Sequence, residues 1–335
     1  MPIKFPPFPV SRWLKFLLSA FLVAIAVLGI KSCTLIAPPL QPLTIGYSTW
    51  PGYQVLLYAQ ANGLFEKRGL TVKLNRYDFI PDNLRATMRG YQDASFAPLS
   101  EMLQADYNGE VPEIILAADI SAGSDGIVAR PGITSLPDLI GKKVSARSGT
   151  ITYLVLLEAL ASQGIDPSQV EIVNVANQHG IQLLQQGEID AATLWEPDLS
   201  STVAKTGGQV IYTTAEVDSI VFDGLATRSD VSAKKRKELV QFIKVWFEIM
   251  DAIDANADEV FATVAEALQV NPAEFAQDYS GLKKGDRDLN ERLLIAGELT
   301  QVIEQNHELI SKDPNHGRPV HSTLKINRDL VGEAM

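Results

Sequence analysis

The sequence predicts an α/β protein with two lobes that are joined by two chain crossings. From residue 43 onward, short apolar segments alternate with longer amphipathic ones, which is typical of a sheet covered by helices. The alternation starts again near residue 128 and is followed by mainly helical segments, so a second α/β lobe is predicted inside the first. A chain of 335 residues is long enough for two such lobes.

The N-terminal residues differ from the rest of the chain. Lys4, Arg12 and Lys15 precede an uninterrupted apolar run over residues 16–30, FLLSAFLVAIAVLGI. A basic region followed by an apolar run of this length is typical of a secretory signal, and the run is short for a membrane span. The alternative is an N-terminal anchor that is not cleaved. Both interpretations predict that the bulk of the chain is exported.

Cys33 is the only cysteine, and it follows the apolar run in the segment IKSC. This segment resembles the cleavage site of bacterial lipoproteins: Ser32 suits the position before the cysteine, whereas Lys31 is unusual there. We therefore expect a signal over residues 1–33 with a lipid attached at Cys33, followed by a Pro-containing tether over residues 34–42. With one cysteine, an internal disulfide is excluded.

The net charge restricts the classes of partner that the chain is expected to bind. Removal of the signal takes away four basic residues and no acidic one, so the net charge moves from −11 to −15. A body this acidic is a poor candidate for binding nucleic acid or anionic lipid. We expect a monomer that is attached to a membrane only through its N-terminus.

The first block of strands and helices alternates regularly, which favours a mostly parallel sheet. Strands are expected at Leu43–Tyr47, Thr71–Tyr77, Asp93–Ala97 and Glu113–Ala118. Helices are expected at about Gln54–Lys67, Asp82–Arg89 and Leu99–Tyr107.

The second block repeats this pattern, and helices dominate after it. Strands are expected at Lys142–Ala146, Val170–Val175, Asp190–Leu194, Val210–Thr213 and Ser219–Ala226. Helices are expected at Ile151–Gln163, Ile181–Gln186, after Pro197, and at Lys234–Ala255, Asp258–Leu268 and Leu289–Leu309.

The domain boundaries follow from where the pattern restarts. We expect lobe I to comprise residues 43–125 and 219–335, and lobe II to comprise residues 126–218. The two crossings are predicted at Gly123–Gly126 and at Asp218–Gly224, because glycine tolerates the backbone rotation that a hinge requires.

The segment GYSTWPGY, which joins the first strand to the first helix, carries the first group of candidate binding residues. In open α/β sheets, ligands lie beyond the carboxyl ends of the strands. Ser48 and Thr49 can hydrogen-bond a solute there, and Trp50 and Tyr53 supply apolar walls. The alternative is that Trp50 only closes the end of the core.

The segment ARSGTITY contains the strongest signal for an anion. Ser148, Gly149 and Thr150 lie where a strand ends and a helix begins, and the free amides and positive dipole end of a helix favour a carboxylate, sulfonate or phosphate. A simple helix cap is the alternative. The spaced glycines and lysine of a P-loop are missing.

Five further residues are candidates because they end strands or lie at the predicted crossings. Asp125 and Asp223 lie at the crossings, where a carboxylate can pair with a ligand amine or cap a turn. Trp195 and Glu196 follow a strand of lobe II, and Ser100 follows a strand of lobe I. Trp195 either faces the cleft or packs in the core of its lobe.

Several of these segments together resemble a known family. IGYSTWPGYQVLLYAQANGLFEKRGLTVKL, DASFAPLSEM, SDGIVARPGITSLPDLIGKKVSARSGT and LLQQGEIDAATLWEP are similar to the nitrate/sulfonate/taurine substrate-binding proteins of ABC importers, over about residues 43–330. The resemblance implies a type II periplasmic binding protein fold with a ligand cleft between its lobes and extra C-terminal helices. It also implies a small solute and delivery to an inner-membrane permease.

The function expected from these observations is that of a solute-binding receptor. An anion-favouring helix end beside carboxylates suits a small organic anion or a zwitterion of the sulfonate or taurine type. Alternatives are a receptor for a thiamine-precursor pyrimidine or another nutrient, a periplasmic enzyme, and a sensor module. We expect no enzyme, because the chain has no cysteine after Cys33 and no G-x-S-x-G segment. The four scattered histidines predict neither a metal site nor a cofactor.

Overall fold

The structure is a computed structural model, and it describes residues 1–3, 39–105, 109–217, 220–312, 317 and 319–335. The chain divides into two units, Met1–Pro39 and Leu40–Met335, and all strands and helices below belong to the second. No helix within the described ranges is both long and apolar enough to cross a membrane. The predicted signal, Cys33 and most of the tether lie outside the described residues.

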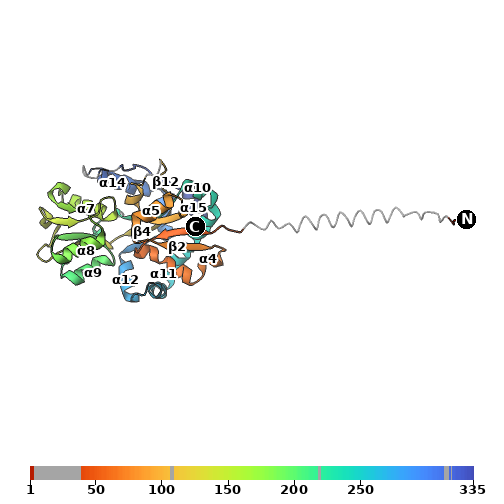
Figure 1. Cartoon of the computed structure of the whole chain (residues 1–335), viewed down its shortest axis with the longest axis horizontal. Coiled ribbons are helices and arrows are strands. Elements are labelled where there is room, and N and C mark those ends of the chain that lie inside the picture. Colours follow the sequence, from red (N-terminus) through yellow and green to blue (C-terminus); the bar gives the residue numbers. More distant parts are fainter. Residues whose placement is uncertain (4–38, 106–108, 218–219, 313–316, 318) are drawn as a thin grey trace. The chain divides into compact units, whose positions relative to one another are not determined.

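The body contains two sheets, one in each of two lobes (Figure 1). The larger sheet has the strand order β11 (Leu282–Lys284), β4 (Glu113–Ser121), β10 (Phe222–Thr227), β3 (Ala94–Pro98), β1 (Leu43–Tyr47), β2 (Val72–Arg76). A seventh strand, β12 (Lys325–Ile326), lies outside this order and pairs with β4. The smaller sheet has the order β7 (Glu171–Val173), β6 (Lys143–Ser145), β8 (Ala191–Trp195), β5 (Asp125–Ala129), β9 (Gln209–Thr213).

The expectation of mostly parallel sheets is wrong, because both sheets are mixed. In the larger sheet β10 runs antiparallel to β3 and β4, and in the smaller sheet β5 runs antiparallel to β8 and β9. These reversed strands are the ones that follow the two crossings, from β4 to β5 and from β9 to β10. A chain that arrives from the facing lobe enters at the rim where the other strands end, so it must run in the opposite direction.

Helices surround the two sheets. Those of the larger lobe are α2 (Pro51–Gln54), α3 (Leu56–Ala61), α4 (Leu64–Lys67), α5 (Ile80–Met88), α6 (Leu99–Met102), α10 (Ser229–Lys234), α11 (Arg236–Leu268), α12 (Pro272–Ser280), α13 (Arg287–Asn290), α14 (Leu299–Ser311) and α15 (Arg328–Ala334). Those of the smaller lobe are α7 (Ile151–Ser162), α8 (Asn177–Gln186) and α9 (Asp198–Thr206). Helix α14 also packs against α7.

Three predicted helices differ from the observed ones because of local backbone requirements. The helix expected over residues 54–67 is three short helices, and Gly63 has a φ of 62° between the last two. The helix expected over residues 289–309 contains a π-helical turn at Glu291–Ile295 and is interrupted at Gly297, whose φ is 93°. The helix expected over residues 99–107 ends at Met102. The separation predicted between residues 255 and 258 is confirmed by the non-helical backbone of Asn256 inside α11.

The predicted crossings are only partly correct. Gly126 belongs to β5, where a Cβ atom would lie 2.5 Å from the carbonyl oxygen of Tyr212, and Gly224 belongs to β10, where a Cβ atom would lie 2.8 Å from the carbonyl oxygen of Leu116. These glycines permit close approach between strands. Asp125 and Asp223 likewise lie in strands. Of the predicted hinge glycines, Gly123 has the backbone that favours glycine, with a φ of 137°.

One hydroxyl connects the two crossings. The Oγ1 atom of Thr214, which lies after β9, accepts a hydrogen bond from the backbone amide of Gly123 at 2.9 Å. The same atom is 2.8 Å from the Oγ atom of Ser121 at the end of β4. The two crossings are therefore hydrogen-bonded to each other where they connect the lobes.

An aromatic cluster holds the larger lobe together. Phe96 of β3 is fully buried, and its ring centroid lies 5.2 Å from those of both Tyr53 and Trp246. Phe242 stacks on Phe65 at 5.7 Å. The cluster joins α2, the sheet and α11, so the segment after β1 is anchored by packing on residues about 200 positions away along the chain.

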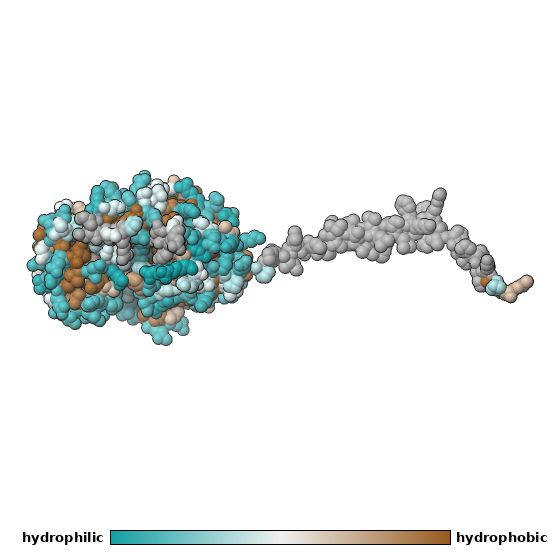
Figure 2. Space-filling view, turned by 45° about the horizontal axis from the view of Figure 1, so that its top comes forward, coloured by the Kyte–Doolittle hydropathy of each residue, from teal (hydrophilic) through white to brown (hydrophobic). Residues whose placement is uncertain are grey.

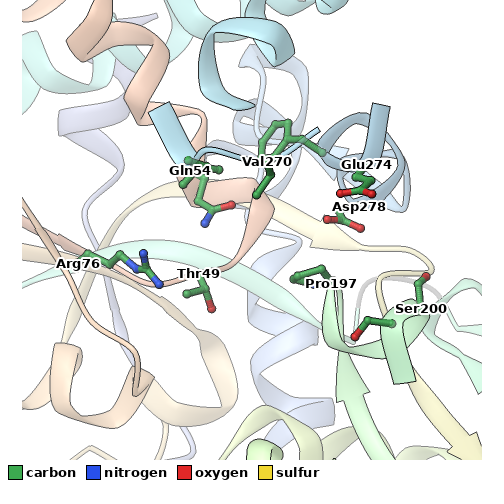
Figure 3. Close-up of a pocket in the computed structure, with 11 residues that line it drawn as sticks. Thr49, Gln54, Arg76, Pro197, Ser200, Val270, Glu274 and Asp278 are labelled. Carbon is green, nitrogen blue, oxygen red and sulfur yellow. The ribbon is translucent and has the colours of Figure 1, made fainter. Parts of the chain in front are cut away.

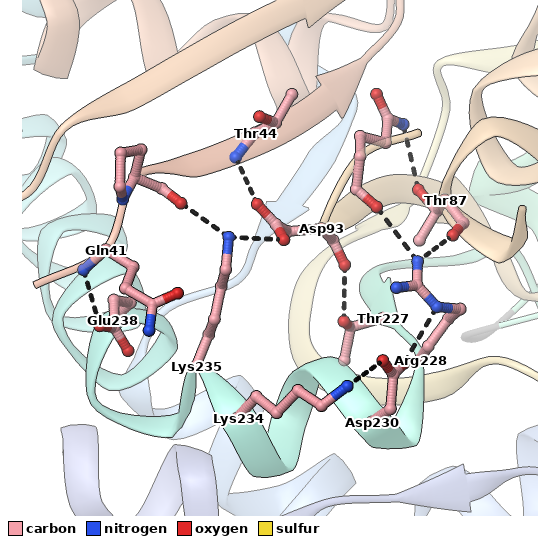
Figure 4. Close-up of polar contacts among 12 residues, drawn as sticks. Gln41, Thr44, Thr87, Asp93, Thr227, Arg228, Asp230, Lys234, Lys235 and Glu238 are labelled. Atoms are coloured by element: carbon pink, nitrogen blue, oxygen red, sulfur yellow. Dashed lines mark hydrogen bonds and ion pairs between the residues drawn. The ribbon is translucent and has the colours of Figure 1, made fainter. Parts of the chain in front are cut away.

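The basic segment at the start of α11 forms ion pairs within the larger lobe (Figure 4). Lys235 pairs with Asp93 at 2.8 Å, and it also donates to the carbonyl oxygen of Pro42. The same carboxylate accepts a hydrogen bond from the backbone amide of Thr44. Lys234 pairs with Asp230. These contacts attach the residues before β1 to the larger lobe.

Figure 2 shows the surface of the body. Hydrophilic residues dominate the visible face, and the largest apolar patch on that face lies at the end occupied by the smaller lobe. This surface agrees with the composition of the chain, of which 21% is charged.

The aromatic cluster leads to a stability prediction. Phe96→Ala should lower the free energy of unfolding by about 3–5 kcal/mol, because it leaves a cavity among closely packed rings. Tyr91→Ala is the control, since Tyr91 is 77% exposed, and it should change stability by less than about 0.5 kcal/mol. Urea unfolding followed by circular dichroism measures both, and equal losses would contradict this account of the core.

Candidate functional site

Residues from both lobes surround a small central cavity. Trp50, Tyr53 and Asp223 from the larger lobe line it together with Asp125 and Trp195 of the smaller lobe. Its volume is about 10 Å³, which is about the space of one water molecule. The structure therefore brings these five predicted residues together, in a closed arrangement of the lobes.

Two aromatic side chains of the segment after β1 bond carboxylates in the neighbouring strands. The Nε1–H of Trp50 donates to both carboxylate oxygens of Asp119, at 3.1 and 3.2 Å. The hydroxyl of Tyr53 donates to Asp223. Pro51 is a favourable first residue for α2. Gly52 leaves room for the carboxylate, because a Cβ atom there would lie 2.1 Å from Oδ2 of Asp119.

The register of the strands places these carboxylates close together. Asp119 of β4 and Asp223 of β10 are direct cross-strand partners. Asp125 begins β5 opposite Trp195 of β8. All three aspartates are at most 3% exposed. Like charges directly opposite each other are unfavourable, so this arrangement needs compensation.

Burial dominates the electrostatics of the three aspartates. Burial, together with smaller effects of Asp223 and Glu196, raises the pKa of Asp125 to about 8, against an ordinary value of 3.8. The pKa values of Asp119 and Asp223 are also raised, mainly by burial. No cationic side chain within the described ranges lowers the pKa of any of the three. The Oδ2 atom of Asp125 has no hydrogen-bond partner among those residues.

Glu101 of α6 adds a fourth carboxylate on the side of α7. It is 5% exposed. Burial and Asp223 raise its pKa well above the usual range, although the amide of Ile151 and the guanidinium of Arg147 lower it. The N-terminal end of α7 thus faces a protein carboxylate.

A second cavity, of about 390 Å³, contains the cationic groups of the cleft. Arg76, Arg147, Thr150, Asn177 and Gln178 are among its lining residues. The guanidinium of Arg147 lies 4.2 Å from the ring centroid of Phe79, which holds it over an aromatic face. These donors can bind an anionic group.

A third cavity, of about 560 Å³, adjoins the second and shares Thr49 and Arg76 with it. Figure 3 shows Gln54 and Thr49 facing this space, with Glu274 and Asp278 of α12 on the wall opposite Arg76. Pro197 and Ser200 of the smaller lobe complete it. Burial, Glu196 and Glu274 raise the pKa of Asp278 to about 7.

The predicted anion-binding segment has a defined local geometry. Gly149 has a φ of 80°, and Thr150 precedes α7 without capping it through its side chain. The hydroxyl of Thr150 donates to the carbonyl oxygen of Arg147 at 2.8 Å, and the amide of Ser148 donates to Asn174. Thr150 lines the second cavity, whereas Ser148 and Gly149 line none of the three cavities. Anion binding by this segment stays a prediction.

The remaining predicted residues are Ser48, Ser100 and Glu196, and they line none of the three cavities. Ser48 is buried and accepts a hydrogen bond from the amide of Trp50. Ser100 is buried in α6, and none of the three cavities is lined by it. Glu196 accepts two hydrogen bonds from Ser200, one from the amide at 3.0 Å and one from the hydroxyl at 2.5 Å. The negative charge of Glu196 acts on both the central and the third cavity, because it raises the pKa of Asp125 and that of Asp278.

Sequence reasoning missed many residues of the cleft, and six of them matter most for its charge and polarity. They are the carboxylates and polar groups that adjoin predicted ones in space: Gln54, Arg76, Glu101, Asp119, Arg147 and Asp278. A signal existed for Asp119, which is a lone acid in the apolar run LAADI, and for Gln54 and Glu101, which follow Tyr53 and Ser100 directly. No local signal distinguishes Asp278 from other helix carboxylates.

Within the described part of the chain, no group of three or more His, Cys, Asp or Glu side chains is arranged to hold a metal ion. The carboxylates of the central cavity are instead satisfied by Trp50 and Tyr53, or lack a partner in the described residues.

Comparison with known proteins identifies the family. The model of the NMT1-like family matches residues 36–269, which is more than half of the chain. The chain belongs to the NMT1-like family. This NMT1-like protein is 30% identical over 222 residues to the taurine-binding periplasmic protein of Escherichia coli (strain K12), which covers 64% of this chain and 68% of the relative.

Solved structures confirm the predicted fold of the NMT1-like chain. The periplasmic aliphatic sulphonate binding protein SsuA from Escherichia coli superimposes with a TM-score of 0.71 at 17% identity, covering 87% of this chain and 99% of that one. The body therefore has a periplasmic-binding-protein-like α/β fold with two lobes. A structure titled desulfurization enzyme DSZB shares this fold, with a TM-score of 0.63 at 15% identity, covering 87% of this chain and 98% of that one.

The raised carboxyl pKa values predict how stability depends on pH. Between pH 4 and 8 the native form holds protons on Asp125 and its neighbours that the unfolded chain releases, because the folded pKa of Asp125 is about 8 and the ordinary value is 3.8. The free energy of unfolding should therefore fall as pH rises from 5 to 8.5, by up to about 1.4 kcal/mol per pH unit for each such group.

Asp125→Asn should flatten this dependence, since an amide cannot titrate. Urea unfolding at five pH values between 5 and 8.5 measures the slope for the unmodified chain and the variant. Asp258→Asn, an exposed aspartate of α11, is the control and should keep the original slope. Identical slopes for all three proteins would show that Asp125 does not hold a proton in the native form.

Proposed function

We propose that the chain is the solute-binding receptor of an ABC importer. It captures a small amine-bearing organic acid, a zwitterion of the taurine or amino-sulfonate type, between its lobes and delivers it to an inner-membrane permease. The observation that carries this proposal is the group of buried carboxylates around the central cavity, which comes from strands of both lobes and has no cationic partner within the described residues.

A cationic nitrogen suits the central cavity for two reasons. The Oδ2 atom of Asp125 is buried without a hydrogen-bond partner among the described residues, and an ammonium group would supply both a donor and a compensating charge. Trp50 and Trp195 border the same cavity, and aromatic faces attract cations. The acidic group of the solute would lie toward Arg147 in the second cavity.

Binding requires the lobes to open. A central cavity of about 10 Å³ cannot hold an amino-sulfonate, so the solute enters when the larger and the smaller lobe move apart. Gly123 and Thr214 lie where such a motion would pivot. Closure then removes water and strengthens each polar contact.

The cellular setting follows from the relatives and from the N-terminus. The NMT1-like relative from Escherichia coli is named a periplasmic protein, and the apolar run over residues 16–30 favours export. We place this chain in the periplasm, tethered by lipid at Cys33, as a monomer that docks on its permease.

We further propose that the protein is not an enzyme. The fold is shared with a structure titled as a desulfurization enzyme, so fold alone does not separate the two functions. The buried carboxylates of the cleft come from strands of both lobes and have no cationic partner among the described residues, which suits the binding of a cation. Taurine or ethanesulfonate incubated with the protein should be recovered unchanged by mass spectrometry.

Isothermal titration calorimetry with three matched solutes tests the proposed ligand class. Taurine should bind, whereas ethanesulfonate, which lacks the amine, should bind at least about 10-fold more weakly, because a charge-assisted hydrogen bond contributes about 1.5–3 kcal/mol. Nitrate should not bind. Asp125→Asn should remove most of the preference for taurine.

Trp195→Ala and Tyr91→Ala provide the matched aromatic pair. Trp195 is at the central cavity and Tyr91 is on the surface, so the first should weaken taurine binding by about 10-fold and the second should leave it unchanged. Tight binding of nitrate without binding of any amine would refute the amine-bearing solute while keeping a receptor function.

Lipid attachment has its own test. Cys33→Ser should move the protein from the membrane fraction to the soluble periplasmic fraction, because the thiol is the only site for a thioether-linked lipid in the chain. Fractionation followed by immunoblotting measures the distribution. A membrane fraction that is unchanged in the variant indicates an uncleaved anchor.

A further inference from the structure

The third cavity contains a buried polar side chain without a partner. Gln54 is the last residue of α2 and is only 8% exposed. Its side-chain amide makes no hydrogen bond within the described ranges, and it points into the cavity of about 560 Å³ (Figure 3). Its polar atoms are not among the fully buried ones, so they are open to the cavity and available to a group that enters from outside the chain.

The size of the third cavity argues for a long solute. Cavities of roughly 300–1,000 Å³ bury ligands of drug-like size. A solute as short as taurine, held by its amine in the central cavity and by its acid near Arg147, would leave the third cavity empty. The third cavity lies on the other side of Thr49 from Arg147, since Thr49 and Arg76 line both larger cavities.

The charges on the walls of the third cavity indicate the chemistry of the incoming group. Asp278 and Glu274 of α12 face the space, and neither forms an ion pair with a described residue. Arg76 on the opposite wall is already paired with Asp78 at 3.3 Å. The unmet charge is therefore negative, which favours a cationic hydrogen-bond donor.

Helix α12 is also connected to the crossings. The carbonyl oxygen of Asp278 accepts a hydrogen bond at 3.1 Å from the hydroxyl of Ser124, which lies between β4 and β5. Ser200 and Pro197 close the cavity from the smaller lobe. A group bound between Gln54 and Asp278 would thus contact both lobes and stabilise the closed form.

We propose that the third cavity is a second subsite of the same cleft, which binds a distal amine of an elongated solute between Gln54 and the carboxylates Asp278 and Glu274. This rests on the proposed function, because the proximal amine occupies the central cavity. The solute class is accordingly an organic amine with a second cationic nitrogen, longer than an amino-ethanesulfonate.

A length series of amines tests the subsite by calorimetry on the full chain. The probes are 1,3-diaminopropane, 1,5-diaminopentane, spermidine and spermine, with taurine as the short zwitterion. Affinity should rise by roughly 10-fold or more at the length that reaches the third cavity, because one charge-assisted hydrogen-bonded contact is added there.

Two variants and one matched control test whether the gain in affinity for long amines arises in the third cavity. Asp278→Asn should abolish the step in affinity, and Gln54→Met, which keeps the volume but removes the amide, should reduce it. Both should leave the affinities for taurine and 1,3-diaminopropane within about 2-fold of the original. Gln185→Ala, an exposed glutamine of α8, should change none of the values.

The outcomes separate the subsite from the proposed function. Affinities that do not depend on length, or a step that survives Asp278→Asn, refute the subsite, and taurine binding would still support the receptor. Equal weakening of short and long amines by both variants also refutes it, because the residues would then act on the central cavity. If no probe binds, the receptor for amines and its second subsite are rejected together.

Discussion

Burial of acidic side chains without cationic partners is the constraint on which the rest of this cleft depends. Asp119 and Asp223 lie opposite each other on neighbouring strands, and Asp125 approaches them from the other lobe. A buried carboxylate needs either a proton, a hydrogen-bond donor or a cation. Trp50 and Tyr53 supply donors to two of the three. The remaining deficit connects stability to pH, and the proposed binding of a charged nitrogen rests on it.

The way the chain crosses between lobes creates this deficit. Each crossing delivers a reversed strand, β5 or β10, into a sheet whose other long strands end at the same rim. Asp125, the first residue of β5, and Asp223, the second residue of β10, therefore lie opposite Trp195 and Pro98, the last residues of β8 and β3. Carboxylates that are more than 90 positions apart along the chain share one small volume because of this topology. Without residues 1–33 the net charge of the chain would be −15, and a charge of this sign favours the approach of cationic solutes.

Local patterns predicted most of the fold because they report on single elements. The strand expected at Leu43–Tyr47 is confirmed, and the helix expected after Ser148–Thr150 begins at Ile151. Predictions were wrong where the role of a residue depends on a partner that is distant in the sequence. Gly126 and Gly224 suggested hinges, but they are needed for close packing between strands. The reversed directions of β5 and β10 were missed because periodicity carries no information about the direction of pairing.

The sequence by itself determined the α/β pattern, the acidic character of the chain, the family resemblance and the strand-to-helix segment that contains Trp50 and Tyr53, because each depends on composition or on residues adjacent in the chain. The tertiary structure alone decided that Asp119 opposes Asp223, that Glu101 faces the start of α7, and that Gln54 and Asp278 border one cavity. These relationships arise from strand register and from two crossings, and proximity across a sheet or between lobes has no trace in local sequence.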